Sequence, residues 1–265
     1  MRRGAPLPTD LTAGNTLLMV PQSRPLVTAV LLTRPEAQGA RFAAALAEAL
    51  GPVRLVTSPL MAPAFLVPAI PLRPDALIFT SETGVEGYRR LAAPELSDVR
   101  RAWCVGNRTA RAAEAAGLAA HSAEGDAERL IAAILAADEP GPLLHLRGAE
   151  SRGEVAPRLA AAGLTAAEAV VYDQRPQPLS SEARALLTDG APVIAPLFSP
   201  RTARLLAQEL ARIGGTGPLW VAAMSPAVAE AAAALPVARL SVAARPDAEA
   251  LLHAVKALLD AEADA

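Results

Sequence analysis

The chain has 265 residues and a formal net charge of −2, and its hydrophobic residues, 52% of the total, include few aromatic ones, at 3%. Such a chain has no overall attraction for polyanions and few rings to stack on bases, so nucleic acid is not an expected partner. A single cysteine, Cys104, excludes an intramolecular disulfide and is typical of a reducing compartment. No apolar run approaches the ~18 residues of a membrane span, so the composition predicts a cytoplasmic protein without a membrane partner.

The N-terminal part of the chain combines a segment without periodicity and a first regular unit. Residues 1–28 are rich in Pro, Thr and Gly and are predicted to form a mobile extension. An apolar run at 29–35 predicts a strand, an Ala-rich stretch at 36–50 predicts a helix that a Gly-Pro pair ends, and 53–60 predicts a second strand. Strand, helix and strand at this spacing indicate a βαβ unit with parallel strands.

The alternation of strands and helices continues after a proline-rich stretch. Residues 62–76 contain four prolines, which predicts a linker or an edge strand. The elements predicted next are strands at 77–81 and 102–106, each leading into a helix, then a helix at 126–137, a strand at 141–148, a helix at 150–162, strands at 167–176 and 192–200, a helix at 201–214, a strand at 218–226, and helices at 227–235 and 246–263. This order is typical of parallel α/β sheets.

Four short motifs recur in the same order about 120 residues further along the chain. LLTR at 31–34 corresponds to LHLR at 144–147, IFTS at 78–81 to PLFS at 196–199, CVGNRTA at 104–110 to AMSPAVA at 223–229, and DAERL at 126–130 to DAEAL at 247–251. Single matches are easy in Ala-rich sequence, whereas four in register are not. The expected fold class is therefore α/β, with two similar lobes, each a parallel sheet flanked by helices.

The strand-to-helix junctions are the places where we expect a site, because parallel sheets bind ligands beyond the carboxyl ends of their strands. Ser81 and Ser199 each follow a strand, where a serine either caps the helix or contacts a ligand. Arg34 and Arg147 each end a strand, where a guanidinium suits either a carboxylate ligand or a salt bridge between lobes. Thr109, in the first turn after a glycine, fits turn formation as well as anion binding.

Other kinds of chemistry have less support. No Gly-rich nucleotide motif, P-loop or G-x-S-x-G elbow is present in the sequence. His121, His145 and His253 lack metal-ligand spacing, so no metal is expected, and His145 is interpreted as packing on a sheet face. Tyr172, in AVVYDQ near the junction of the lobes, is either a core or hinge residue or a proton donor in a dry cleft.

An ordered set of motifs resembles the uroporphyrinogen-III synthase family. The motifs are LLTRPEAQ, LIFTSETGV, WCVGNRTARAAEAAGL, LLHLRGAESRGEVAPRLAAAGL, VVYDQRP and PLFSPRTARLL, and the resemblance extends over residues 29–260. It implies two α/β lobes joined by a two-stranded connection: a discontinuous first lobe of 29–61 plus 177–265, a second lobe of 62–172, and a connection at 173–176. It also implies a cytoplasmic, cofactor-free monomer.

The resemblance further implies an activity. Members of the family are lyases of heme biosynthesis that cyclise hydroxymethylbilane to uroporphyrinogen III, with loss of water and inversion of ring D. The substrate carries eight carboxylates, which backbone N–H groups, hydroxyls and arginines would bind. Tyr172 falls on the tyrosine expected to act as the catalytic acid. The expected substrate-binding residues are Arg34, Ser81, Thr83, Gly106, Asn107, Thr109, Arg147, Arg152, Ser199 and Ser225.

One motif departs from the family pattern. The sequence MSPAVA at 224–229 has Ser225 where the family has a glycine, and Ala227 and Val228 where it has threonines. The loss of hydroxyl donors predicts weaker contacts from the C-terminal lobe, by about 1 kcal/mol for one of them. It leaves open a second function, a non-catalytic tetrapyrrole- or anion-binding paralogue that kept the fold. A generic two-lobed ligand sensor is a third alternative with less specific support.

Overall fold

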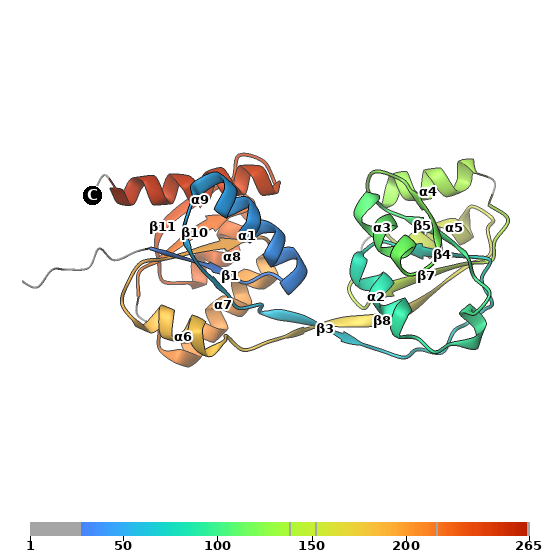
Figure 1. Cartoon of the computed structure of the whole chain (residues 1–265), viewed down its shortest axis with the longest axis horizontal. Helices are drawn as coiled ribbons and strands as arrows, with labels where there is room; N and C mark the ends of the chain where they lie inside the picture. Colours follow the sequence, from blue (N-terminus) through green and yellow to red (C-terminus); the bar gives the residue numbers. More distant parts are fainter. Residues whose placement is uncertain (1–27, 138, 152, 216, 264–265) are drawn as a thin grey trace, which may run out of the picture.

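The computed structural model describes residues 28–137, 139–151, 153–215 and 217–263. They form two α/β lobes that lie side by side along the long axis of the molecule (Figure 1). The predicted mobile extension lies outside the described residues except for Thr28, which is buried. Among the described helices, none is long and apolar enough to cross a membrane.

In the described part of the chain, the first lobe is built on a five-stranded parallel sheet in the order β11-β10-β9-β1-β2. Its strands are β1 (Ala29–Leu32), β2 (Arg54–Thr57), β9 (Val193–Leu197), β10 (Leu219–Ala223) and β11 (Val237–Val242). Its helices are α1 (Glu36–Leu50), α6 (Ser181–Thr188), α7 (Pro200–Ile213), α8 (Pro226–Ala231), the 3-10 turn η2 (Ala232–Ala234) and α9 (Ala248–Ala263). Because strand side chains alternate, Val30 and Leu32 pack under α1 and α9, whereas Leu31 packs under α6, α7 and α8.

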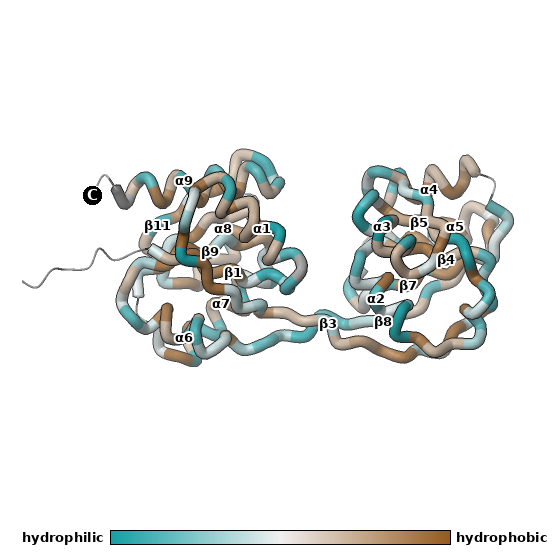
Figure 2. Tube along the Cα trace, viewed as in Figure 1, coloured by the Kyte–Doolittle hydropathy of each residue, from teal (hydrophilic) through white to brown (hydrophobic). Residues whose placement is uncertain are grey.

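The second lobe has, among the described residues, a six-stranded sheet in the order β3-β8-β7-β4-β5-β6. Its strands are β3 (Met61–Phe65), β4 (Ala76–Phe79), β5 (Arg101–Cys104), β6 (Ala119–Ser122), β7 (Leu143–Gly148) and β8 (Ala166–Pro176). The helices are α2 (Glu82–Arg90), the 3-10 turn η1 (Pro94–Leu96), α3 (Asn107–Ala115), α4 (Ala127–Ala136) and α5 (Val155–Ala161). Leu77 and Phe79 of β4 pack under α2 and α3, and Ile78 packs under α4 and α5. Hydrophobic segments concentrate on the central strands of both lobes (Figure 2).

The two sheets have the same strand order when β4, β5, β6, β7 and β8 are matched with β9, β10, β11, β1 and β2. The sequence repeats fall on matched elements, since IFTS and PLFS end β4 and β9, and LHLR and LLTR end β7 and β1. The second lobe is continuous in the chain, whereas the first takes its last strand–helix–strand unit from the N-terminal side. The predicted fold class is therefore confirmed.

A two-stranded connection joins the lobes. Strand β3 pairs antiparallel with the distal half of β8, from Phe65 opposite Tyr172 to Met61 opposite Pro176, and both strands run between the lobes (Figure 1). Part of the proline-rich stretch thus forms a strand at the sheet edge, where prolines are tolerated. The lobe boundaries 29–61 plus 177–265 and 62–172, with the connection at 173–176, stay a prediction; Met61 and residues 173–176 belong to the sheet of the second lobe.

Four local features differ from the sequence prediction. The strands β6 and β11 and the helix α6 were not predicted, because β6 and β11 are edge strands with alternating burial and no apolar run and α6 has a single short apolar face. Helix α5 begins at Val155, five residues later than predicted. The residue before it, Glu154, has a φ of 44°, which interrupts right-handed helix geometry.

Candidate ligand-binding cleft

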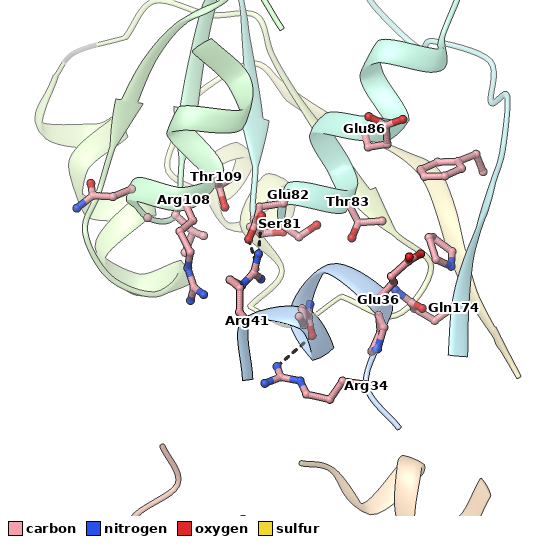
Figure 3. A pocket seen from close by; sticks show the side chains of 18 of the residues that line it. Arg34, Glu36, Arg41, Ser81, Glu82, Thr83, Glu86, Arg108, Thr109 and Gln174 are labelled. Atoms are coloured by element: carbon pink, nitrogen blue, oxygen red, sulfur yellow. Dashed lines mark hydrogen bonds and ion pairs between the residues drawn. The ribbon is translucent and has the colours of Figure 1, made fainter. Parts of the chain in front are cut away.

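A cavity of about 1100 Å³ opens between the two lobes at the carboxyl ends of β1, β4 and β5. Its volume lies slightly above the usual range for small-molecule sites, about 300–1,000 Å³. The first lobe contributes the end of β1 and one side of α1, and the second contributes the first turns of α2 and α3 (Figure 3). The site therefore lies where parallel sheets normally bind ligands, and we call it the cleft.

The N-termini of α2 and α3 both face the cleft. Helix α2 begins after Ser81, whose Oγ accepts a hydrogen bond from the backbone N–H of Gly84 at 3.0 Å. Helix α3 begins after Gly106, and no side chain caps it. A Cβ added at Gly106 would meet no atom within 4 Å, so the absent side chain leaves the backbone open to the cleft. Two helix N-termini without a buried counter-charge favour an anionic ligand.

Four arginines line the cleft: Arg90, which pairs with Glu86, and Arg34, Arg41 and Arg108. Burial lowers the pKa of Arg34 below its usual value, and the positive charges of Arg41 and Arg108 lower that pKa further. The Arg34 guanidinium lies 3.9 Å from the centre of the Phe198 ring and donates to Oε1 of Gln38 at 3.0 Å. Within the described residues, neither Arg34 nor Arg108 forms an ion pair with a carboxylate. Their charges are available to an anion.

Four carboxylates also line the cleft, and two of them form ion pairs. Glu82 forms an ion pair with Arg41 at 3.2 Å, which links α2 of one lobe to α1 of the other (Figure 3). Glu86 pairs with Arg90 on its own helix, and Glu124 accepts from Nδ2 of Asn107 at 3.3 Å. Glu36 lines the cleft as well, and neither it nor Glu124 forms an ion pair among the described residues. A ligand would therefore meet the unpaired guanidiniums of Arg34 and Arg108 together with two carboxylates.

A side pocket of about 300 Å³ adjoins the cleft and shares Thr80, Ser81 and Val105 with it. The hydroxyl of Tyr172, at the middle of β8, lies 3.1 Å from Oγ of Ser81 in this side pocket. The tyrosine ring packs against Gly148, where an added Cβ would lie only 2.6 Å from Cζ of Tyr172. Gly148 thus leaves the space that the ring fills.

A buried histidine supports the wall between the two cavities. His145 on β7 is 0% exposed, and its Nε2 lies 3.2 Å from Oγ1 of Thr80. Burial lowers the pKa of His145 to about 4, a nearby Glu168 raises it and Arg147 lowers it, so the ring is neutral at pH 7. Thr80 lines both cavities, although it is not among the predicted binding residues. The signal was its place just before the capping serine.

The structure brings together most of the residues predicted to bind the ligand. Those that line the cleft are Arg34, Ser81, Thr83, Gly106, Asn107 and Thr109, and Tyr172 lies in the side pocket. Arg41, Arg108 and Thr80 also line the cleft and are not among the predicted binding residues. Arg108 directly follows the predicted binding residues Gly106 and Asn107, so its position in the sequence could have predicted that it lines the cleft. Arg41 lies in the middle of a helix, where no local pattern indicates a binding residue.

Three of the described residues that were predicted to bind the ligand do not line either cavity. Arg147 turns toward β8, where its guanidinium pairs with Glu168, and it donates to the carbonyls of Gly148 and Ala149. Ser199 caps α7 through the backbone N–H of Thr202 at 3.2 Å. Ser225 precedes α8 without a capping bond, and Arg152 lies outside the described residues.

The fold and the cleft define a two-lobed α/β protein with a polar cavity between its lobes. Residues 41–253 match the family model described as uroporphyrinogen-III synthase HemD, so the chain belongs to the uroporphyrinogen-III synthase family. The members of this family are enzymes of porphyrin biosynthesis. No curated protein sequence matches the chain significantly.

Solved structures agree with the family assignment at the level of fold. The uroporphyrinogen-III synthetase of Helicobacter pylori is similar with a TM-score of 0.56 and 16% identity, over 87% of this chain and 99% of that chain. The uroporphyrinogen III synthase of Thermus thermophilus is 19% identical over 89% of this chain and 99% of that chain, with a TM-score of 0.38. The first of these likenesses supports the two-lobed fold.

Proposed function

We propose that this protein is a uroporphyrinogen-III synthase, which converts hydroxymethylbilane into uroporphyrinogen III and water. Membership of the family supports the reaction class. The observation that carries the proposal is the convergence of two unpaired guanidiniums, on Arg34 and Arg108, with two helix N-termini in one cavity of about 1100 Å³. Guanidiniums and backbone N–H groups bind carboxylates strongly, and this substrate carries eight of them.

In the proposed mechanism, the cleft holds the linear substrate in a curled conformation that brings ring A near ring D. Arg34 and Arg108 bind side-chain carboxylates from opposite lobes. Thr83, Asn107 and Thr109 are placed to add neutral contacts around them. Holding reacting ends together supplies a large part of the rate enhancement in such cyclisations.

Tyr172 is the proposed acid. It donates its proton to the leaving hydroxyl as the C–O bond breaks, which forms water. A pyrrole N–H proton is lost in the same step, so the substrate becomes a neutral azafulvene and the acid is restored through solvent. The substituted α-carbon of ring D then attacks the azafulvene carbon. The resulting spiro intermediate fragments to a second neutral azafulvene and recloses through the other α-carbon of ring D, which inverts that ring. The proton lost from this α-carbon is balanced by protonation of the azafulvene nitrogen, so no net proton is released. The Ser81 hydroxyl, 3.1 Å from the tyrosine, orients the acid.

The remaining proposals follow from the same reading. We propose that Arg147 is structural, because its charge is satisfied by Glu168, and that Ser199 acts as a helix cap. We also propose that the enzyme works as a cytoplasmic monomer without a cofactor, as the family resemblance implies.

A non-catalytic binding protein is the second candidate. The motif at 224–229, which departs from the family pattern, favours it. Ser225 has almost the same φ as Gly106, −161° against −162°, so the two lobes have matching backbones there. Val228 is 1% exposed and packs in the core of the first lobe, in the place that corresponds to Thr109 in the second. The first lobe therefore brings fewer hydroxyls to the ligand than the second.

The two candidates are separated by an isomer assay. Purified protein is incubated with freshly prepared hydroxymethylbilane, and the products are oxidised to porphyrins and resolved by chromatography. The type III isomer is expected, formed faster than spontaneous closure. Type I alone at the spontaneous rate would overturn the proposed function, and tight binding of uroporphyrinogen III under those conditions would favour the second candidate.

A further inference from the structure

The pair formed by His145 and Thr80 is not used by the mechanism described above. His145 is 0% exposed on the central strand β7, and its Nε2 lies 3.2 Å from Oγ1 of Thr80, which directly follows the neighbouring strand β4. No partner for Nδ1 is present among the described residues, although that atom is buried. Thr80 in turn lines both the cleft and the side pocket. A buried ring therefore touches the ligand cavity through one hydroxyl.

The orphaned Nδ1 decides which nitrogen carries the proton. A neutral imidazole has one N–H donor and one acceptor nitrogen. If the proton were on Nδ1, a buried N–H would have no acceptor, which is rare in folded proteins. If it is on Nε2, that N–H donates to Oγ1 of Thr80 and only a lone pair stays unpaired. The tautomer with the proton on Nε2 is therefore favoured, because it leaves no buried N–H group without an acceptor.

The tautomer fixes the role of Thr80. A threonine hydroxyl has one proton to donate and lone pairs to accept. When Oγ1 accepts from His145, its own proton is free, and the cavity is the side on which Thr80 is exposed. Thr80 then faces the ligand as a donor. In the opposite tautomer its proton would point back to the ring and the ligand would meet a lone pair.

We propose that His145 is a positioning residue: its Nε2–H donates to Thr80 and directs the threonine hydroxyl proton toward a carboxylate oxygen of the ligand. The role assigned to the ligand rests on the proposed function, whereas the tautomer does not. Glu168 and Arg147, which face the ring from β8 and β7, are paired with each other. They therefore leave the imidazole neutral rather than competing for Nε2.

The first test is the tautomer itself. Protein labelled with ¹⁵N at histidine is studied by NMR at pH 7, where ¹⁵N shifts and N–H couplings identify the protonated ring nitrogen. The His145 signals are assigned by their loss in His145→Gln. A proton on Nε2 is the expected result, and a proton on Nδ1 would overturn the inference whatever the activity of the protein.

The second test is a double-mutant cycle on turnover of hydroxymethylbilane. Thr80→Val and His145→Leu are each expected to raise KM about fivefold with little change in kcat, as for loss of one hydrogen bond made equally to substrate and transition state. The double variant is expected to resemble either single variant, because His145 acts through Thr80. Effects that multiply would overturn the inference, since a purely structural histidine would act independently of the hydroxyl.

Two further variants keep this test sharp. His145→Gln retains an N–H donor and is expected to keep KM near the wild-type value even if His145→Leu folds poorly; a fivefold rise in KM for His145→Gln would contradict the inference. His253, exposed on α9 of the other lobe, gives the matched control His253→Leu. If wild-type protein makes no type III isomer, the proposed function fails, and the cycle is then run on fluorescence-monitored binding of uroporphyrinogen III.

Discussion

The hydroxyl of Tyr172 lies 3.1 Å from Oγ of Ser81, so the middle of β8 and the N-terminus of α2 meet through two side chains that are 91 residues apart. The Oγ of Ser81 also accepts the backbone N–H of Gly84 at 3.0 Å. A residue that begins a helix thereby orients a phenol in the side pocket. The sequence left helix capping and a contact in the ligand site as alternatives for Ser81. In the structure the same hydroxyl can serve both roles.

The first prediction concerns the phenol. Tyr172→Phe keeps the ring that packs against Gly148 and removes only the hydroxyl. We expect kcat for type III formation to fall tenfold or more, because a positioned general acid contributes at least that much, while the unfolding transition stays unchanged. Initial rates of type III formation and denaturant unfolding measure the two effects.

The matched control for this variant is the other tyrosine of the chain, Tyr88. Tyr88 packs edge-on against Phe79 and lies outside the cleft and the side pocket. Tyr88→Phe is expected to retain kcat. Equal rates for Tyr172→Phe and the wild type would leave Tyr172 as a packing residue of the connection.

The second prediction uses the space beside the ring. A Cβ on Gly148 would lie 2.6 Å from Cζ of Tyr172 and 2.9 Å from its hydroxyl oxygen. Gly148→Ala should therefore displace the ring, reduce kcat as Tyr172→Phe does, and cost about 1–3 kcal/mol of unfolding free energy through overpacking. Gly106→Ala is the stability control, since its Cβ would meet nothing within 4 Å. An active Gly148→Ala variant would show that the ring position does not matter.

Local sequence patterns predicted the residues of the cleft that follow β4 and β5. They did not predict the contacts from neighbouring strands that hold those residues. The junctions after β4 and β5 were predicted because an apolar run followed by small polar residues and a helix is a local pattern. The contact of His145 with Thr80 spans 65 residues and depends on β7 lying next to β4, which the order of elements along the chain does not reveal. The ion pair of Arg147 with Glu168 is hidden in the sequence for the same reason, since Glu168 lies on a neighbouring strand.

The third prediction concerns Arg108, which lies in the first turn of α3 and has no carboxylate partner among the described residues. Arg108→Gln should raise KM for hydroxymethylbilane several-fold and weaken its dependence on salt, because one charge–charge contact is removed. Arg111→Gln, one turn further along α3 and outside the cleft, is the control with the same change of net charge. If both variants shift KM equally, the effect is general electrostatics and Arg108 makes no direct contact.

The fourth prediction concerns the ion pair across the cleft. Glu82 holds Arg41 at 3.2 Å and competes with an anionic ligand for it. Glu82→Gln should therefore lower KM, most clearly at low salt, with little change in stability, because an exposed ion pair contributes about 0–1 kcal/mol. Glu128→Gln, which breaks the exposed pair with Arg158 away from the cleft, is the control. A higher KM for Glu82→Gln would mean that the bridge shapes the binding site.

The last prediction is a pH dependence of stability from His145. Burial lowers the folded-state pKa of this histidine to about 4 from a usual value of 6.5, so between these values the unfolded chain binds a proton that the folded chain does not. The stability due to neutral His145 is therefore complete above pH 6.5 and is lost as the pH falls toward 4, by about 2 kcal/mol between pH 7 and pH 5. The pair of Glu168 with Arg147 lowers the pKa of that carboxyl, so its stability is lost in a separate window, below pH 4.5. Denaturant unfolding at pH 7 and pH 5 measures the difference.

His145→Gln, which cannot titrate, should flatten the dependence of the unfolding free energy on pH between those values, whereas His253→Gln should not. An equally steep dependence for His145→Gln would place the proton uptake on another residue.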